Sequence, residues 1–161
     1  SYPAVDPVEL PVESPIGFDE TMFDMEDESI LEEPVMLTEE QVSFVPDKST
    51  YLNEEEAVAT IQPIADYLTK HEQITVLLAG TTAGDEDSDY TMTLSQERAD
   101  AVRDTLIQFG VDESRIVTVG LGSSDPWHVY GAGYEGSIAS GNRKVVLLDA
   151  SSDTAKDILS E

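Results

Sequence analysis

Apolar residues recur at helical spacing in two stretches of the chain. The first stretch follows Asn53, a residue type that caps helix N-termini, and it begins with three glutamates, which the helix dipole favours in a first turn. Pro63 falls inside this stretch and predicts a kink or a break, because proline lacks the N–H that a helix interior needs. The apolar positions lie three or four residues apart and define one buried face, made of Val58, Ile61, Ala65 and Leu68.

The second stretch predicts a helix over residues 94–109. Gly110 follows its last apolar residue and is well placed to end the helix in a left-handed conformation. The apolar positions again lie three or four residues apart, and they are Ala99, Val102, Leu106 and Phe109.

Four short segments have the composition of β-strands. Residues 42–44 alternate apolar and polar side chains up to Pro46, which cannot donate a hydrogen bond to a sheet. Compact apolar runs follow at 74–79, 116–119 and 145–148. The order strand, helix, strand, helix, strand, long loop, strand predicts an α/β (α+β) fold: a two-layer sandwich with a mixed four-stranded sheet and two main helices on one face.

A glycine-rich loop of about twenty residues connects the last two predicted strands, and loops of this length are usually functional or specially packed. It carries three large aromatic residues, Trp127, Tyr130 and Tyr134. Two interpretations stay open. The aromatic side chains form a contact platform for a sugar or a protein, or Trp127 closes the edge of the core.

Acidic residues outnumber basic residues by 34 to 8, which gives a formal net charge of −26. This balance excludes nucleic-acid binding, because affinity for phosphates comes from lysine and arginine. It also disfavours adsorption to an anionic membrane surface. The chain has no run of roughly 18–20 apolar residues, so we expect no direct insertion into a membrane.

The acidic residues are concentrated at the start of the chain. Residues 1–40 hold thirteen of them, together with five of the eight prolines and no lysine or arginine. This composition is typical of a solvated, extended arm. The segment also has large apolar side chains such as Phe18 and Phe23, which favour packing of part of the arm. We therefore divide the chain into an acidic arm over 1–40, a folded domain over 41–150 and a C-terminal tail over 151–161.

Patterns for catalysis and metal binding are weak. Cysteine is absent, which excludes disulfides, thiolate metal sites and a cysteine nucleophile. The two histidines, His71 and His128, have no metal or triad spacing, so we expect no enzyme activity, no metal and no cofactor. The acidic run 85–89 resembles the first half of a calcium loop, but Tyr90 and Gln96 stand where an EF-hand needs Gly and Glu. A solvated turn is the favoured interpretation, and calcium binding of another kind is the alternative.

Several motifs together resemble the OmpA-like C-terminal domain family (OmpA/MotB/Pal), over residues 41–149. The most specific segments are Leu-Ser-Gln-Glu-Arg-Ala at 94–99 and Asn-Arg-Lys-Val at 142–145, which match the family patterns L-S-x-x-R-A and N-R-R-V. Gly-Thr-Thr-Ala at 80–83 and Gly-Leu-Gly at 120–122 resemble the family's G-H-T-D and G-x-G.

The resemblance implies a non-catalytic module that binds peptidoglycan in the extracytoplasmic cell envelope, with a membrane anchor in the full-length protein as a further implication. In that family, an Asp after the second strand and the Arg of the helix motif hold the free end of a diaminopimelate residue. That end is a zwitterion, so its ammonium needs a carboxylate and its carboxylate suits a bidentate guanidinium. Arg98 matches the helix Arg, and Arg143 matches the first Arg of N-R-R.

Other positions depart from the family pattern. The distance from Gly80 to Arg98 is eighteen positions, the family spacing, so the family Asp falls on Ala83, which cannot pair with an ammonium. Thr91 stands where the family has Asn. The predicted ligand-binding residues are Arg98, Arg143, Thr82, Ala83, Thr91 and Asn142, and Asp85, Asp87 and Asp89 are candidate substitutes for the missing acid.

Two functions follow from these observations. The first is weak or altered binding of a diaminopimelate-containing peptidoglycan stem peptide. The second is a fold that has lost this pocket and acts as a structural or protein-interaction domain, using residues 1–40 and the aromatic loop on a protein partner.

Overall fold

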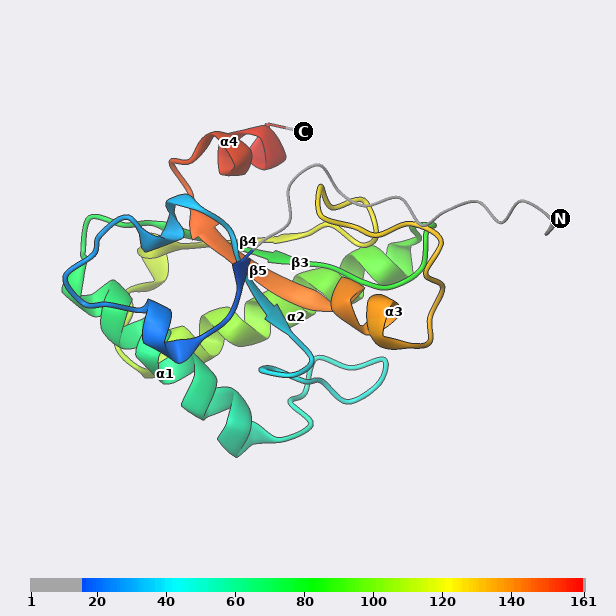
Figure 1. Ribbon diagram of the computed structural model, residues 1–161, viewed down its shortest axis with the longest axis horizontal. Coiled ribbons are helices and arrows are strands. Elements are labelled where there is room, and N and C mark those ends of the chain that lie inside the picture. Colours follow the sequence, from blue (N-terminus) through cyan, green and yellow to red (C-terminus); the bar gives the residue numbers. More distant parts are fainter. Residues whose placement is uncertain (1–15, 161) are drawn as a thin grey trace, which may run out of the picture.

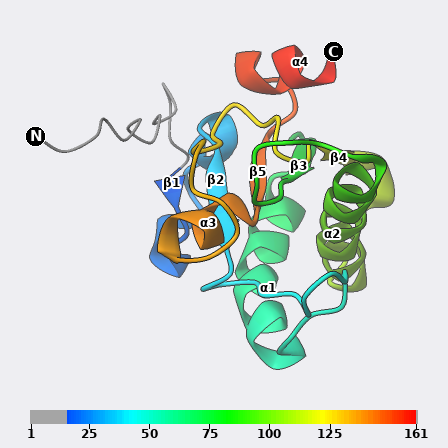
Figure 2. The same ribbon diagram turned by 90° about the vertical axis from the view of Figure 1, so that its right-hand side faces the viewer.

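The sheet in the computed structural model, which describes residues 16–160, has five strands and is mixed (Figures 1 and 2). Parallel pairs lie at its two ends, and the strand between them runs antiparallel to its neighbours on both sides. This arrangement confirms the predicted fold class and adds a two-residue strand at one edge. The strand order is β1 (Ile16–Gly17), β2 (Val35–Thr38), β5 (Lys144–Asp149), β3 (Val76–Gly80) and β4 (Ile116–Gly120).

Helix α1 (Glu54–Lys70) packs with α2 on one face of the sheet, as Figure 2 shows. The Asn53 side chain caps it by accepting a hydrogen bond from the Glu56 N–H, as predicted. The helix continues through Pro63, so the predicted break there is wrong. Ile61 and Ile64 are fully buried on either side of the proline, and this packing offsets the loss of one backbone hydrogen bond.

Helix α2 (Asp89–Gln108) begins five residues before the predicted start. Ser88 caps it, and the hydroxyl of Thr91 closes a reciprocal capping box. The glycines that end β3 and β4 let this helix come very close to the sheet, because a Cβ at Gly80 would lie 2.0 Å from the Ser95 carbonyl oxygen. This close approach fixes the position of the first turns of α2.

The first long strand lies earlier in the chain than predicted. It is β2, whose residues Val35 and Leu37 are buried, whereas residues 42–44 form no strand. Phe44 makes one isolated bridge with Tyr51, within a loop that the Val45 N–H and the Thr50 carbonyl oxygen also close. Alternation over three residues does not distinguish such a loop from a strand.

Residues 16–40, which composition assigned to an extended arm, form two 3₁₀ turns (Glu20–Met22 and Ile30–Glu32) and pack into the same core as α1. Phe23 is buried edge-on against Tyr67, and the Tyr67 hydroxyl donates to the Asp27 carbonyl oxygen at 2.6 Å. Over these residues the alternative of a packed arm is the one that the structure supports. Residues 1–15 of the predicted arm lie outside the described residues.

The opposite face of the sheet is covered by the segment that we expected to be a tail. Figure 1 shows helix α4 (Asp153–Leu159) on the side of the sheet away from α1 and α2. Its Ala155 packs with Trp127 against Leu77 and Val146. Trp127 is 3% exposed, so it closes the core and is not part of a contact platform. The long loop contains the short helix α3 (Ser137–Asn142), and a 3₁₀ turn (Glu113–Arg115) precedes β4. Among residues 16–160, no helix is both long and apolar enough to cross a membrane.

Candidate binding pocket

A cavity of about 390 Å³ opens between the start of α2, the end of β3 and the loop that follows β2. Five of the six predicted ligand-binding residues line it, namely Arg98, Arg143, Thr82, Ala83 and Thr91. The spacing of the family motifs therefore brings together residues that lie up to about sixty positions apart in sequence. A cavity of this size accommodates a small polar ligand.

Arg98 projects from α2 into the wall of this pocket and is 8% exposed. Its Nε donates to the Lys48 carbonyl oxygen at 2.9 Å and its Nη2 to the Val45 carbonyl oxygen at 3.4 Å. Its guanidinium carbon lies 5.0 Å from the centre of the Phe44 ring. Within residues 16–160 no carboxylate forms an ion pair with it. Because these bonds use two of the five N–H donors, Arg98 can still bind an anion.

Burial lowers the pKa of Arg98 below its usual value, because removing the guanidinium from water disfavours the charged form. The negative charge of Glu39 opposes this effect most strongly, and Asp47 acts in the same direction. Both acids line the pocket. An anionic ligand placed there would compensate the desolvated cation.

Arg143 lies at the C-terminal end of α3, on the other side of the pocket. Its Nη1 forms an ion pair with Glu39 at 3.1 Å, and its Nη2 donates to the Tyr134 carbonyl oxygen. The side chain is about one third exposed. Arg143 therefore adds a second positive charge to the pocket, which Glu39 partly neutralises.

Ala83 and Thr82 form the end of the pocket next to β3. Ala83 is buried and offers no charge, as the sequence indicates. Thr82 is also buried, and its Oγ1 has no hydrogen-bond partner within the described part of the chain. A buried hydroxyl without a partner is costly, so a ligand that bonds to it would gain free energy. Thr91 also lines the pocket, but its hydroxyl is used in the cap of α2.

The three candidate substitute acids do not line the pocket. Asp85 accepts hydrogen bonds from the Gly131 N–H at 2.9 Å and from His128, and these bonds lower its pKa. Asp87 accepts bonds from Ser123 and Ser124; burial raises its pKa, but these bonds outweigh burial and the pKa is lowered. Asp89 is exposed in the first turn of α2.

Asp85 and Asp87 bond to different partners in the long loop. Among residues 16–160 no group of three or more His, Cys, Asp or Glu side chains is arranged to hold a metal ion. The run 85–89 is instead an anchor for two loops and the beginning of a helix.

Sequence reasoning missed the two acids that do line the pocket, Glu39 and Asp47. Asp47 has a left-handed backbone with φ of 63° and accepts a hydrogen bond from the Tyr90 hydroxyl at 2.5 Å. The signal for it is Pro46, because proline marks turns, whereas the alternation before Pro46 predicts a strand that ends there. Glu39 follows β2, which sequence reasoning also missed.

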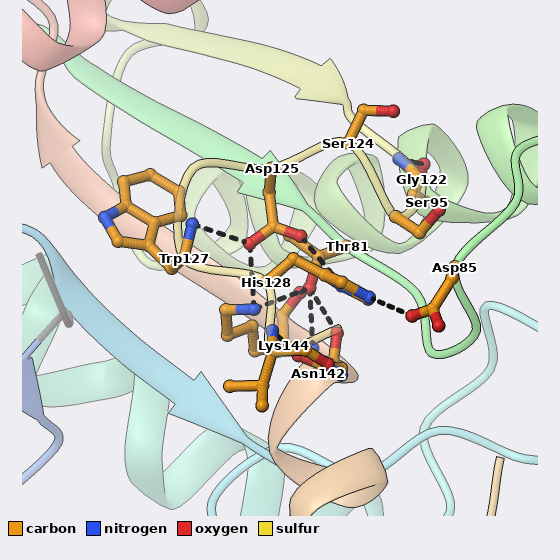
Figure 3. Close-up of polar contacts among 12 residues, drawn as sticks. Thr81, Asp85, Ser95, Gly122, Ser124, Asp125, Trp127, His128, Asn142 and Lys144 are labelled. Carbon is orange, nitrogen blue, oxygen red and sulfur yellow. Dashed lines mark hydrogen bonds and ion pairs between the residues drawn. The ribbon is translucent and has the colours of Figure 1, made fainter. Parts of the chain in front are cut away.

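Beside the pocket, which Lys144 also lines, a buried chain of charged residues anchors the long loop to the sheet (Figure 3). Lys144 Nζ lies 3.1 Å from Asp125 Oδ2, and Asp125 Oδ1 lies 3.5 Å from His128 Nδ1. The remaining ring nitrogen of His128 contacts Asp85 at 3.1 Å. Burial lowers the pKa of Lys144, although Asp125 opposes this effect. Burial also lowers the pKa of His128, but the nearby Asp125 carboxylate and the bond with Asp85 outweigh burial, and the pKa is raised.

Asn142, the sixth predicted ligand-binding residue, belongs to this supporting structure. Its side-chain amide accepts from the Val129 N–H and donates to the Val129 carbonyl oxygen, both at 2.9 Å, and the residue is 1% exposed. It therefore holds the long loop in place and does not line the pocket.

Comparison with known proteins agrees with this geometry. Outer membrane porin F of Pseudomonas fluorescens is 35% identical over 92 residues, which cover 57% of this chain and 28% of that protein. In that protein and three other curated relatives, the matched part spans from 24% to 49% of the relative's length. The crystal structure of the peptidoglycan-associated lipoprotein from Burkholderia pseudomallei is 30% identical, with a TM-score of 0.56, and covers 66% of this chain and 86% of that chain.

The periplasmic domain of Helicobacter pylori MotB shares the fold, with a TM-score of 0.60 at 18% identity over 78% of this chain and 80% of that chain. The family model for the OmpA family matches residues 43–134, which include the pocket residues of α2 and of the end of β3. The motifs, the sheet topology and this match together show that the chain belongs to the OmpA family.

Proposed function

We propose that this chain is a non-catalytic binding module of the extracytoplasmic cell envelope, which holds the free end of a diaminopimelate residue in a peptidoglycan stem peptide. The observation that carries the proposal is Arg98, a buried guanidinium that lines a cavity of about 390 Å³ without an ion-paired carboxylate among residues 16–160. The peptidoglycan-associated lipoprotein with the same fold supports it by analogy.

The carboxylate end of the ligand has a receptor in this pocket. Arg98 keeps N–H donors after its bonds to the Lys48 and Val45 carbonyl oxygens, and Arg143 supplies a second positive charge. Charge-assisted bonds from a guanidinium to a carboxylate are about twice as strong as bonds between neutral groups. The buried position of Arg98 reduces competition from water.

The ammonium end lacks the family acid, because Ala83 stands in its place. The loss of one charged partner typically costs about 1.5–3 kcal/mol, or roughly ten- to more than a hundredfold in affinity. A pocket that offered the ammonium no other acid would therefore bind the ligand more weakly than a complete zwitterion receptor.

Titration with a diaminopimelate-containing muropeptide, followed by calorimetry or NMR, tests this function. Wild-type protein should bind saturably, and Arg98→Lys should bind at least tenfold more weakly, because an ammonium cannot form the bidentate contact. Arg103→Lys is the matched control, since Arg103 lies on the same helix, pairs with Asp100 and Asp104, and does not line the pocket. Absence of wild-type binding at about 1 mM ligand would overturn the proposal.

The alternative function, a protein-interaction domain that acts through residues 1–40, has weaker support. Residues 16–40 pack on the domain itself, as the contacts of Phe23 and Tyr67 show. Trp127 packs in the core, so it is not available for an aromatic contact platform. A protein partner for residues 1–15 stays a prediction.

A further inference from the structure

We propose that Asp47 supplies the negative charge that the pocket lost at Ala83, and that it binds the ammonium of the ligand while Arg98 binds the adjacent carboxylate. This inference rests on the proposed function and specifies how the same pocket recognises a zwitterion. Asp47 comes from the loop after β2, whereas the family acid falls at Ala83, after β3. The two positions lie on different walls of the same pocket.

Asp47 is the pocket acid that is still available for a cation. Glu39 is already paired with Arg143 at 3.1 Å. Asp47 accepts a hydrogen bond from the Tyr90 hydroxyl, and no lysine, arginine or histidine within residues 16–160 forms an ion pair with it. A carboxylate has four lone-pair positions, so this one bond leaves capacity for an ammonium.

Arg98 also fixes the loop that carries Asp47. The guanidinium donates to the carbonyl oxygens of Val45 and Lys48, which lie on either side of Asp47 in sequence. The Lys48 N–H donates to the Val45 carbonyl oxygen and closes a turn around the same residue. Within this turn Asp47 has a φ of 63°, a conformation that Asp tolerates better than most residues. The loop is therefore held in one geometry before a ligand arrives.

The two charges share one pocket without neutralising each other. Arg98 and Asp47 form no ion pair with each other, yet Asp47 is close enough to oppose the effect of burial on the pKa of Arg98. A receptor for an α-amino acid end needs this arrangement, because each charge must remain free for its counterpart on the ligand. The unpartnered Thr82 Oγ1 provides a third polar contact on the β3 side.

Two synthetic stem peptides separate the contributions of the ligand's two charged groups. One peptide carries diaminopimelate, and the other carries 2-aminopimelate, which keeps the terminal carboxylate and lacks the ammonium. Asp47→Asn should reduce the affinity for the diaminopimelate peptide by about ten- to a hundredfold. It should leave the weaker affinity for the aminopimelate peptide unchanged, because that peptide has no charge for Asp47 to bind.

Asp89→Asn is the matched control, because it makes the same charge change at an exposed acid outside the pocket. Asp47→Gly is the second variant, since glycine accepts the left-handed backbone and removes the carboxylate. Addition of Ala83→Asp to Asp47→Asn should restore binding, because it returns an acid to the pocket wall.

The outcomes distinguish this inference from the proposed function. If wild-type protein binds the diaminopimelate peptide with the expected dependence on Arg98, but Asp47→Asn and Asp47→Gly bind it equally well, the role of Asp47 is overturned and the proposed function stands. If wild-type protein binds neither peptide, the proposed function and the role of Asp47 are both overturned. An equal loss for both peptides would also overturn the inference, because it would show that Asp47 supports the fold of the loop and not the ammonium.

Discussion

His128 Nε2 lies 3.1 Å from Asp85 Oδ1, so a fully buried imidazole in the long loop is joined to the loop that follows β3 (Figure 3). The other ring nitrogen of His128 lies 3.5 Å from Asp125, and Lys144 contacts the far oxygen of the same carboxylate. Tyr130 lies edge-on against the ring at 4.6 Å between centroids. The two loops beside the pocket are therefore connected through one titratable side chain.

The His128 contacts predict a pH dependence of stability. The pKa of His128 is raised in the folded protein, although burial alone would lower it, because Asp125 and Asp85 stabilise the charged ring; Lys144 opposes them. A raised pKa contributes stability that is fully present below the unfolded value of about 6.5 and is lost as pH rises through the folded value. We expect the unfolding free energy of wild type to exceed that of His128→Gln by the largest amount at the acid end of the range from about pH 5 to 8. Denaturant unfolding at several pH values measures this difference. A difference that grows toward alkaline pH would contradict this sign.

Lys144 and Asp125 form a buried ion pair, and its disruption should be costly. Both side chains are at most 1% exposed, and their charged atoms are 3.1 Å apart. Lys144→Met would remove the cation that contacts Oδ2 of the buried Asp125 carboxylate, and the loss of one partner of a buried ion pair typically costs about 3–5 kcal/mol of unfolding free energy. The exposed Lys156→Met on α4 is the control and should change stability by less than about 0.5 kcal/mol. Equal unfolding midpoints for the two variants in urea would refute the assignment.

The sequence predicted the sheet and the main helices well where long-range packing and local pattern agree. The buried faces of α1 and α2 follow the apolar steps around Ile61 and Val102, and Gly110 has the expected left-handed φ of 99°. Prediction failed for β2 because four residues inside an acidic, proline-rich segment give a weak local signal. β2 is a strand because it pairs with β5. The paired residues lie about 110 positions apart, so a local sequence window does not reveal this pairing.

The residues of the candidate site that belong to the family motifs could be predicted from the sequence. Arg98 and Arg143 were found from L-S-x-x-R-A and N-R-R-V, and both line the pocket. Asp47 could not be found this way, because its place depends on a turn that a buried guanidinium holds through backbone carbonyl oxygens. Asp85 and Asp87 lie close to the motif in sequence, but their orientation depends on partners in the long loop that are more than thirty positions away.

Gly80 predicts a steric limit on the packing of α2 against β3. A Cβ there would lie 2.0 Å from the Ser95 carbonyl oxygen, which is backbone and cannot rotate away. Gly80→Ala should therefore destabilise the protein by about 1–3 kcal/mol, because α2 has to move. Gly141→Ala is the matched control, since a Cβ at Gly141 meets nothing within 4 Å. Thermal unfolding of both variants checks the prediction, and a Gly80→Ala protein as stable as the control would contradict the close packing.

Phe23 tests whether residues 16–40 belong to the cooperative fold. Its ring is 7% exposed and lies 5.5 Å from the Tyr67 ring, centroid to centroid, in an edge-on contact. Phe23→Ala removes a buried aromatic side chain from the layer that covers α1, and we expect a loss of about 3 kcal/mol in unfolding free energy. Leu52→Ala, at a residue that is 63% exposed, should change stability by less than about 0.5 kcal/mol. Urea denaturation followed by circular dichroism compares the two variants. Equal midpoints would mean that the acidic segment can leave α1 without unfolding the domain, whereas a single, lowered midpoint for Phe23→Ala would make it part of the folded unit.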